Sequence, residues 1–248
     1  MQIRIYENPQ ILGKSAGSEA ARLIRNAITE QGHATIILAT GTSQFETLKQ
    51  LVAEEIDWSN VTMFHLDEYI GLSEAHPASF RNYLTQRFIS SVPALKAIHL
   101  INGESDAEEE CKRLNELISR QPVDVALVGI GENGHLAFND PPADFETAQP
   151  YLVVELDEQC RKQQFGEGWF RSLEDVPRHA ISMSIRQIMK SKQIICSVPD
   201  SRKAIAVRDC LEGPVSNMHP ASILQQHTGC IVYLDENSAS LLSAKRES

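Results

Sequence analysis

Short apolar runs that are typical of strands alternate with amphipathic stretches along nearly the whole chain. Between about residues 9 and 30, small and aliphatic side chains recur on one face of a helical pattern, and four later stretches repeat this periodicity. We expect strands at residues 3–6, 35–39, 61–66, 97–100, 123–128, 151–156, 193–198 and 229–234, and helices at about 9–30, 45–52, 77–89, 106–118 and 201–211. Elements that alternate in this way favour a mostly parallel sheet with helices on both faces. The sequence therefore predicts an α/β fold, a three-layer αβα sandwich with a Rossmann-like sheet.

The length of 248 residues and the hydrophobic content of 42% allow one large buried core. No internal repeat, low-complexity tract or linker divides the chain, so we expect a single domain over residues 1–248. The weakly patterned stretch at residues 141–178 has two interpretations, a lid over a site or an ordinary irregular connection.

The formal net charge of -10 argues against nucleic acid or an anionic membrane as a partner, because no basic run offsets the repulsion. A small anionic molecule would then be held by a local cluster of cations. The cysteines are odd in number and show no metal-ligand spacing, so we expect reduced packing residues and a cytoplasmic protein. They are Cys111, Cys160, Cys196, Cys210 and Cys230. We find neither a signal peptide nor an apolar run long enough to span a bilayer.

A glycine-rich loop follows the buried run at residues 124–128. It reads Gly129-Ile130-Gly131-Glu132-Asn133-Gly134 and leads into His135. Ligands of open α/β sheets gather at the carboxyl ends of such strands, so chemistry is expected here. The loop also matches the GxGxxG pattern of dinucleotide-binding folds. Pro141 and Pro142 would break the helix that this pattern requires, which argues against a nicotinamide or flavin cofactor.

Polar residues also follow three other strands. Thr40, Gly41, Thr42 and Ser43 precede a helix, where they could bind a phosphate through backbone N–H groups and hydroxyls or simply cap the helix. Lys203 falls in the first turn of a helix, where a cation is unfavourable unless it serves an anion. The adjacent carboxylates Asp67 and Glu68 follow the strand at 61–66 and have either a catalytic role or the ordinary one of solvated charges.

Three strings together resemble the glucosamine-6-phosphate deaminases. They are residues 65–72 (HLDEYIGL), residues 76–80 (HPASF) and residues 129–139 (GIGENGHLAFN). The sister family of 6-phosphogluconolactonases shares the fold and a related glycine-histidine loop, but typically reads Asp-Glu-Arg where this chain reads Asp67-Glu68-Tyr69. The order of elements extends the resemblance over nearly the whole chain.

The resemblance implies an enzyme that opens the ring of glucosamine 6-phosphate, moves a proton from C2 to C1, and releases ammonia to leave fructose 6-phosphate. His135 would open the ring, a task that suits a group with an ordinary pKa of about 6.5. Asp67 would be the base at C2. By the same resemblance, Thr40, Gly41, Thr42 and Ser43 would bind substrate and its phosphate, with Glu68, Gly131 and Lys203. Such a reaction requires no metal and no cofactor.

The chain departs from some family members at three positions. Asn133 and Asp140 occupy the positions of an aspartate and a glutamate that orient the catalytic histidine, so we place both in the catalytic set. Gln164 stands where a phosphate-binding arginine is expected, and Arg161 or Arg171 could supply that charge instead. Alternatives are therefore a 6-phosphogluconolactonase, a galactosamine-6-phosphate isomerase and a non-catalytic sugar-phosphate sensor. The sequence leaves a homo-oligomer open.

Overall fold

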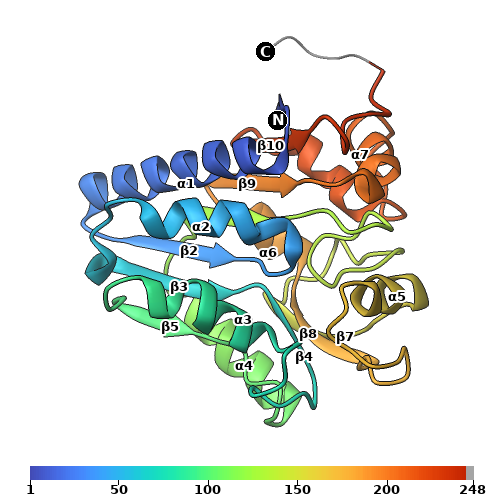
Figure 1. The fold of residues 1–248 in the computed structure, drawn as a ribbon. Coiled ribbons are helices and arrows are strands. Elements are labelled where there is room, and N and C mark those ends of the chain that lie inside the picture. Colours follow the sequence, from blue (N-terminus) through green and yellow to red (C-terminus); the bar gives the residue numbers. More distant parts are fainter. Residues whose placement is uncertain (244–248) are drawn as a thin grey trace.

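The computed structural model describes residues 1–243, and Figure 1 shows their arrangement. The strands are β1 (Gln2–Tyr6), β2 (Ala34–Leu38), β3 (Val61–His65), β4 (Asp67–Tyr69), β5 (Ala97–His99), β6 (Val125–Val128), β7 (Tyr151–Glu155), β8 (His179–Met183), β9 (Gln193–Val198) and β10 (Cys230–Asp235). The α-helices are α1 (Pro9–Gln31), α2 (Phe45–Ala53), α3 (Phe80–Arg87), α4 (Ala107–Ile118), α5 (Glu158–Gly166), α6 (Ile185–Met189) and α7 (Ala204–Leu211). Short 3-10 turns η1 (Thr42–Gln44) and η4 (Ser201–Lys203) lead into α2 and α7.

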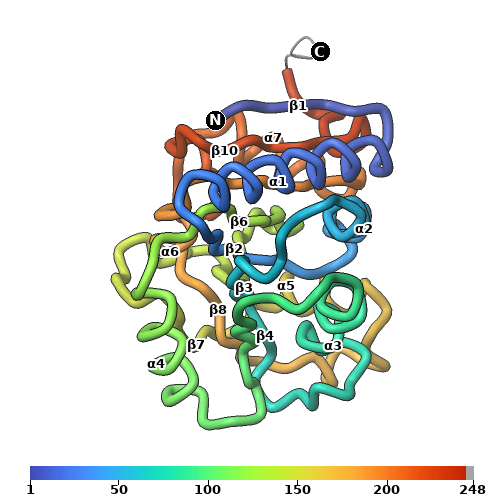
Figure 2. The backbone as a smooth tube through the Cα atoms, turned by 90° about the vertical axis from the view of Figure 1, so that its left-hand side faces the viewer, coloured from blue at the N-terminus to red at the C-terminus, as the bar shows by residue number. Residues whose placement is uncertain are grey.

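Seven strands form the large sheet, in the order β1-β10-β9-β6-β2-β3-β5, and every neighbouring pair is parallel. Every residue of β2, β3 and β6 is buried, as expected for central strands covered on both faces. Figure 2 shows the β1–β10 side of this sheet at the end of the molecule away from β7 and β8. The predicted α/β fold with a mostly parallel sheet is confirmed.

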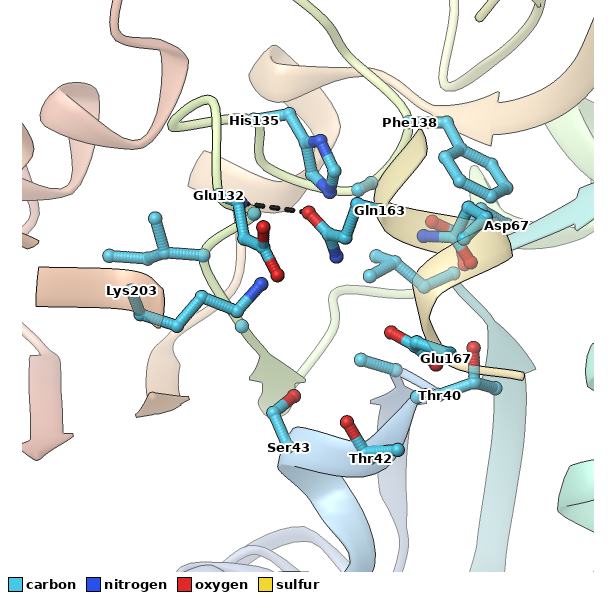
Figure 3. Close-up of a pocket in the computed structure, with 18 of the residues that line it drawn as sticks. Thr40, Thr42, Ser43, Asp67, Glu132, His135, Phe138, Gln163, Glu167 and Lys203 are labelled. Atoms are coloured by element: carbon cyan, nitrogen blue, oxygen red, sulfur yellow. Dashed lines mark hydrogen bonds between the residues drawn. The ribbon is translucent and has the colours of Figure 1, made fainter. Parts of the chain in front are cut away.

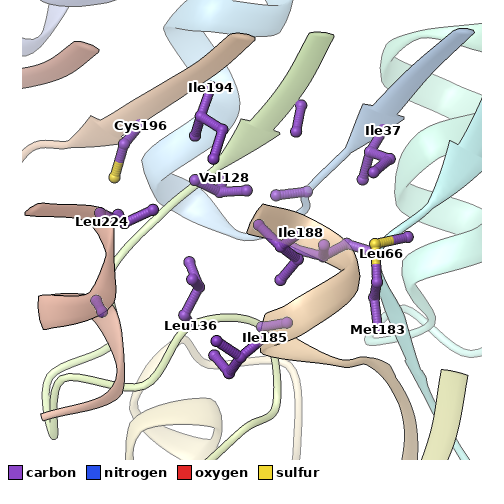
Figure 4. Packing of buried hydrophobic residues seen from close by; sticks show 14 of the residues in the cluster. Ile37, Leu66, Val128, Leu136, Met183, Ile185, Ile188, Ile194, Cys196 and Leu224 are labelled. Atoms are coloured by element: carbon purple, nitrogen blue, oxygen red, sulfur yellow. The ribbon is translucent and has the colours of Figure 1, made fainter. Parts of the chain in front are cut away.

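Side chains that alternate along each strand build two separate apolar layers. Ile36 and Leu38 of β2 pack with buried residues of α1, α2 and α3. Ile37, on the other face of the same strand, belongs to a cluster with buried residues of α4, α6 and α7. Figure 4 shows part of this second layer, where Ile185 and Ile188 lie under the sheet. The two clusters, one on each face of β2, make the predicted three-layer sandwich.

The longest helix begins and ends at strong signals. Asn8 caps α1 by accepting from the backbone N–H of Ile11, and Pro9 is its first residue. Gly32 ends the helix with a φ of 79°, a left-handed conformation that glycine adopts without strain. The predicted helix at residues 9–30 is thereby confirmed.

A second, antiparallel sheet has the order β4-β8-β7. Only Leu66 separates β3 from β4, so the chain passes directly from the large sheet to the small one and carries Asp67 with it. The predicted strand at 151–156 exists as β7 but lies in this small sheet, and β4, β8, α5 and α6 were not expected. These elements have between three and nine residues, too few for a clear periodicity.

The large sheet changes direction between β2 and β6. From β2 the chain adds β3 and β5 on one side, and it then returns to place β6 on the other side. The carboxyl ends of β2 and β6 are therefore neighbours, and ligands of open α/β sheets bind at such a switch point. The loops at residues 40–43 and 129–134 both begin here.

Two further expectations concern the whole chain. All five cysteines are free and buried, in agreement with the prediction of reduced packing residues. No helix within residues 1–243 is long and apolar enough to cross a membrane.

Candidate active site

A cleft opens at the switch point of the large sheet (Figure 3). Its walls come from the ends of β2, β3 and β6, from η4 and from α5. Of the residues expected at a site, the following line it: Thr40, Gly41, Thr42, Ser43, Asp67, Gly131, His135, Lys203 and also Gln164. Glu68, Asn133 and Asp140 do not line it. Side chains from five separate parts of the chain are thus brought together in one cleft.

The loop after β2 presents backbone donors to the cleft. Gly41 has a φ of 87°, which turns the chain sharply into η1, and the hydroxyl of Tyr83 donates to its carbonyl at 2.9 Å. Thr42 and Ser43 open the continuous segment formed by η1 and α2, so their N–H groups have no intrahelical acceptor. Such groups form a ready binding site for an anion.

Lys203 reaches the same space from η4. The residue is 7% exposed, and Figure 3 shows the ammonium group pointing into the cleft. Burial lowers the pKa of Lys203, while the charges of Glu132 and Glu167 act in the opposite direction. A buried cation that faces a cleft lined by backbone donors suits an anionic ligand.

Asp67 faces the cleft at its other end. It is 6% exposed, and burial, followed by the charge of Glu68, raises the pKa of Asp67 to about 8. Within residues 1–243, no hydrogen bond counters this effect. A carboxyl group with such a pKa gives and accepts a proton near neutral pH, which is the property of a general base.

Glu68 is occupied by the protein itself. Its carboxylate accepts from the N–H groups of Tyr69, Phe80 and Arg81 and from the hydroxyl of Ser79, at 2.8–3.2 Å. The Arg81 Nε lies 3.5 Å from Glu68 Oε2. Although we expected Glu68 among the substrate-binding residues, in this geometry it anchors the start of α3 next to Asp67.

His135 is held by Asn133 and Asp140, and Asp157 supports both of these residues. The Nδ1 of His135 lies 3.1 Å from Asp140 Oδ1, although the N–H direction misses that oxygen, so the contact is electrostatic more than a hydrogen bond. The side chain of Asn133 accepts from the backbone N–H of His135 at 3.0 Å, and donates to Asp140 at 2.9 Å and to Asp157 at 3.2 Å. The backbone N–H of Asp157 binds the second oxygen of Asp140. Asn133 therefore bridges the carboxylates behind the histidine.

Gly131 allows the histidine ring to approach the loop closely. A Cβ at this position would lie 2.3 Å from ring atoms of His135, a distance that real Cβ atoms do not tolerate. The backbone N–H of Gly131 also donates to the carbonyl of His135 at 2.9 Å. Any larger residue would displace the ring.

Helix α5 forms a wall of the cleft that the sequence patterns did not indicate. Gln163 accepts from the backbone N–H of Glu132 at 2.8 Å, the contact marked in Figure 3, and Gln164 accepts from the buried hydroxyl of Tyr69 at 2.7 Å. Glu167 follows this helix and also faces the cleft. The stretch at 141–178 thus contains β7 and α5 and is not a plain irregular connection.

The alternative sources of positive charge, Arg161 and Arg171, do not line the cleft. Arg161 donates to the carbonyls of Leu173 and Val176 at 2.6 and 3.2 Å and so fixes the loop after α5. The arginine that lines the cleft is Arg202, adjacent to Lys203. The expectation for Arg161 is therefore wrong, because the carbonyls of its own loop take its donors.

One group of described side chains has atoms placed closely enough to hold a metal ion. Donor atoms of His135, Asp140 and Cys160 lie within 4.8 Å of one another. Burial raises the pKa of the Cys160 thiol well above its usual value, which favours the protonated form, a poor ligand. Asp140 is already bound to Asn133 and Asp157. This donor set fits a metal poorly, and the absence of a metal requirement stays a prediction.

Comparison with known proteins identifies the family. The family model described as glucosamine-6-phosphate isomerases/6-phosphogluconolactonase matches residues 7–233, so the chain belongs to this family. It is 39% identical to a glucosamine-6-phosphate deaminase of Listeria monocytogenes and 37% identical to one of Lactobacillus delbrueckii subsp. bulgaricus, in each case over 98% of this chain and all of the relative.

Solved structures give the same result. A structure described as a monomeric glucosamine-6-phosphate deaminase superposes with a TM-score of 0.87 at 35% identity, over 97% of this chain and all of that one. The 6-phosphogluconolactonase of Trypanosoma brucei superposes with a TM-score of 0.80 at 17% identity, over 98% of each chain, which shows the shared fold alone.

Proposed function

We propose that the protein converts glucosamine 6-phosphate to fructose 6-phosphate and ammonia by aldo-keto isomerisation and deamination. The observation that carries the proposal is the division of the cleft. A carboxyl group poised near neutral pH and a histidine stand at one end, and a buried lysine with free backbone donors stands at the other. A substrate that combines a reacting aldehyde with a distant phosphate matches this division.

In the proposed mechanism, His135 moves a proton between the anomeric hydroxyl and the ring oxygen, and the sugar opens to the aldehyde. Asp67 then removes the C2 proton, which the neighbouring carbonyl acidifies, and returns it to C1. The enolamine becomes an imine at C2, which water hydrolyses to the ketone with release of ammonia. Ring opening, proton transfer, addition of water to the imine and loss of ammonia each need only a proton donor or acceptor, so the residues of this cleft suffice.

Asp140 and Asn133 act in this proposal as positioning residues. They fix the backbone and ring of His135 through the contacts at 2.9–3.1 Å and do not line the cleft. Glu68 also acts through another residue, because its adjacent charge contributes to the raised pKa of Asp67. Asp67 and His135 are then the groups that touch the reacting atoms.

At the other end, residues 40–43 and Lys203 would hold the phosphate. Binding energy from this end fixes C1 and C2 against Asp67 and His135, and such positioning supplies a large part of the rate enhancement in many enzymes. Arg202, although it lines the cleft, already lies 2.9 Å from Asp200 and is a weaker candidate.

The relatives favour a deaminase over a lactonase. The similar proteins at 35–39% identity are glucosamine-6-phosphate deaminases, whereas the Trypanosoma brucei lactonase has 17%. We further propose that residues 1–248 act as one domain. The oligomeric state stays open, although one similar structure is described as monomeric.

The decisive experiment follows ammonia and fructose 6-phosphate from glucosamine 6-phosphate with purified, metal-stripped protein. Galactosamine 6-phosphate and 6-phosphogluconolactone are assayed in parallel. We expect stoichiometric release of both products from glucosamine 6-phosphate. Turnover of the lactone alone would replace the deaminase by a lactonase, and preferred turnover of galactosamine 6-phosphate would change the sugar. Binding of all three compounds without turnover would identify a sensor.

A further inference from the structure

The phosphate end of the cleft contains a carboxylate that an anion site would not be expected to hold. Glu167 follows the last residue of α5, between Gly166 and Gly168, and its side chain faces the loop after β2. A Cβ at Gly41 would lie 3.8 and 3.9 Å from its two carboxylate oxygens. In Figure 3, Glu167 and Lys203 point into the cleft from opposite sides. An anion bound at the loop would therefore lie close to Glu167.

The cations at this end do not outweigh the carboxylates. The guanidinium of Arg202 lies 2.9 Å from Asp200 Oδ2 and 3.5 Å from Glu132 Oε1, so two carboxylates already compensate it. Lys203 is the remaining positive charge, and it faces both Glu132 and Glu167. A doubly charged phosphate at this place would add repulsion that one lysine cannot balance.

Of the other groups that face Glu167, three are uncharged, and the cation Arg87 lies in a neighbouring groove and does not line the cleft. Tyr83 of α3 and Tyr69 of β4 are buried phenols whose pKa values burial raises, so they stay neutral. Gln163 of α5 is an uncharged amide. Arg87 lines a neighbouring groove with Glu167, but its guanidinium stacks on Phe45, 3.8 Å from the ring centre.

We propose that the phosphate end of the cleft binds a tetrahedral ester group carrying a single negative charge, and that Glu167 sets this preference. A phosphate ester then binds with one proton from solvent, held on its own oxygen or on Glu167, whereas a sulfate ester meets the requirement without a proton. This inference rests on the proposed function and names the charge state of its substrate. Burial, the largest effect on Glu167, raises its pKa and so agrees with proton uptake.

The test compares KM for glucosamine 6-phosphate and glucosamine 6-sulfate at pH 6.0 and 8.0. A phosphate ester loses its last proton with a pKa of about 6, whereas the sulfate ester keeps one charge throughout. Both substrates depend equally on Asp67, His135 and the ammonium group, so the ratio of the two KM values isolates the anionic end. The singly charged phosphate ester falls from about half of the total at pH 6.0 to about 1% at pH 8.0, so we expect this ratio, phosphate over sulfate, to rise about fiftyfold in the wild type.

Glu167→Gln keeps the shape of the side chain and removes its charge. In this variant the KM ratio should change less than threefold over the same pH range, mainly through a lower KM for the phosphate ester at pH 8.0. Glu158→Gln is the matched control, because Glu158 lies on the same helix, is exposed and pairs with Lys162. It should keep the wild-type ratio at both pH values. A flat ratio in the wild type, or an unchanged rise in Glu167→Gln, would overturn the proposal.

A binding measurement separates this inference from the proposed reaction. Glucose 6-phosphate and glucose 6-sulfate have no amino group to release, so their effect on Tm reports binding alone. The quantity to compare is the Tm increase given by the phosphate relative to that given by the sulfate. We expect it to shrink from pH 6.0 to 8.0 in the wild type and in Glu158→Gln. In Glu167→Gln it should not shrink. That pattern without any ammonia release would retain the charge preference and reject the deaminase, whereas no Tm increase with either compound would overturn the preference itself.

Discussion

The two ends of the cleft differ in how the protein treats buried charge. At the reaction end, burial and the neighbouring Glu68 together destabilise the ionised form of Asp67. At the phosphate end, cations and carboxylates alternate, with Lys203 facing Glu167 and Arg202 beside Asp200. The first arrangement raises the reactivity of one group, and the second limits the net charge available to a ligand.

This difference assigns separate tasks to the two ends. A destabilised carboxylate is useful for proton transfer and costs stability, a trade that is common at active sites. A cluster whose positive and negative charges nearly balance binds an anion less tightly than a purely cationic cluster, but it discriminates between charge states of the ligand. Substitutions at the reaction end should therefore change kcat and stability, and those at the phosphate end should change KM.

The largest effect is expected for Asp67→Asn, which removes the base and keeps the shape. kcat should fall by about 10³-fold, a typical contribution of general acid-base catalysis, while KM changes little. Exchange of the C2 proton in deuterated solvent, followed by NMR, reports this step directly. Exchange at the wild-type rate would remove Asp67 from the mechanism and with it the distinction between the two ends.

The same substitution should stabilise the fold at alkaline pH. The pKa of Asp67 is about 8 in the folded protein and about 3.9 when unfolded, so its stability contribution is complete below pH 4 and is lost as the pH rises towards 8. Asn does not ionise, and the free energy of unfolding of Asp67→Asn should exceed that of the wild type by about 5 kcal/mol at pH 8.5. Urea unfolding at pH 4.5 and 8.5 measures this, and an equal difference at both values would contradict a raised pKa.

At the phosphate end, Lys203→Gln should raise KM for glucosamine 6-phosphate by about tenfold to a hundredfold, as expected for a lost charged hydrogen bond. kcat should change less, because Lys203 is placed away from the reacting carbons. Lys162→Gln, on the exposed face of α5, is the control and should behave as the wild type. A fall in kcat at constant KM would give Lys203 a role in the reaction step and would contradict the separate tasks of the two ends.

Most of the scaffold and part of the cleft follow from the sequence. The strands of the large sheet are apolar runs that alternate with amphipathic helices along the chain. The segments that follow their carboxyl ends contain residues 40–43, Gly131, His135 and Lys203. All of these line the cleft. The strength of the prediction comes from the geometry of parallel sheets, which brings distant strand ends together at one edge.

The missing part of the cleft comes from elements with weak local signals. Helix α5 is strongly polar and buries only Cys160 and Gln164, so no apolar face marks it. β4 has three residues, and two of them, Asp67 and Glu68, carry carboxylates. In the sequence they therefore look like solvated loop residues that follow β3. Glu167 and Gln163 reach the cleft only through the docking of α5, a tertiary contact that no pattern within the helix reveals. The near balance of charges at the phosphate end could not be predicted for the same reason, because Glu167 is part of that balance.

The smallest effect is expected at Asn133, where the family resemblance implies an aspartate in some members. The Nδ2 of Asn133 donates to both Asp140 and Asp157, so Asn133→Asp would bring a third carboxylate against two others. We expect a loss of about 1–2 kcal/mol in the free energy of unfolding at pH 7, from two lost hydrogen bonds and new repulsion. The loss should shrink as the pH falls, because the introduced carboxylate is repelled by its neighbours and takes up a proton more readily than an isolated one.

The double variant Asn133→Asp with Asp157→Asn tests this explanation, because it restores an amide between the carboxylates on the opposite side chain. Asn is also a good helix cap, so α5 keeps its start, where Asp157 now accepts from Cys160 at 2.6 Å. Urea unfolding should show the double variant within about 0.5 kcal/mol of the wild type, with each single variant less stable. Additive losses would mean that Asn133 and Asp157 do not act as a pair, and that the amide at 133 serves His135 through its backbone contact alone.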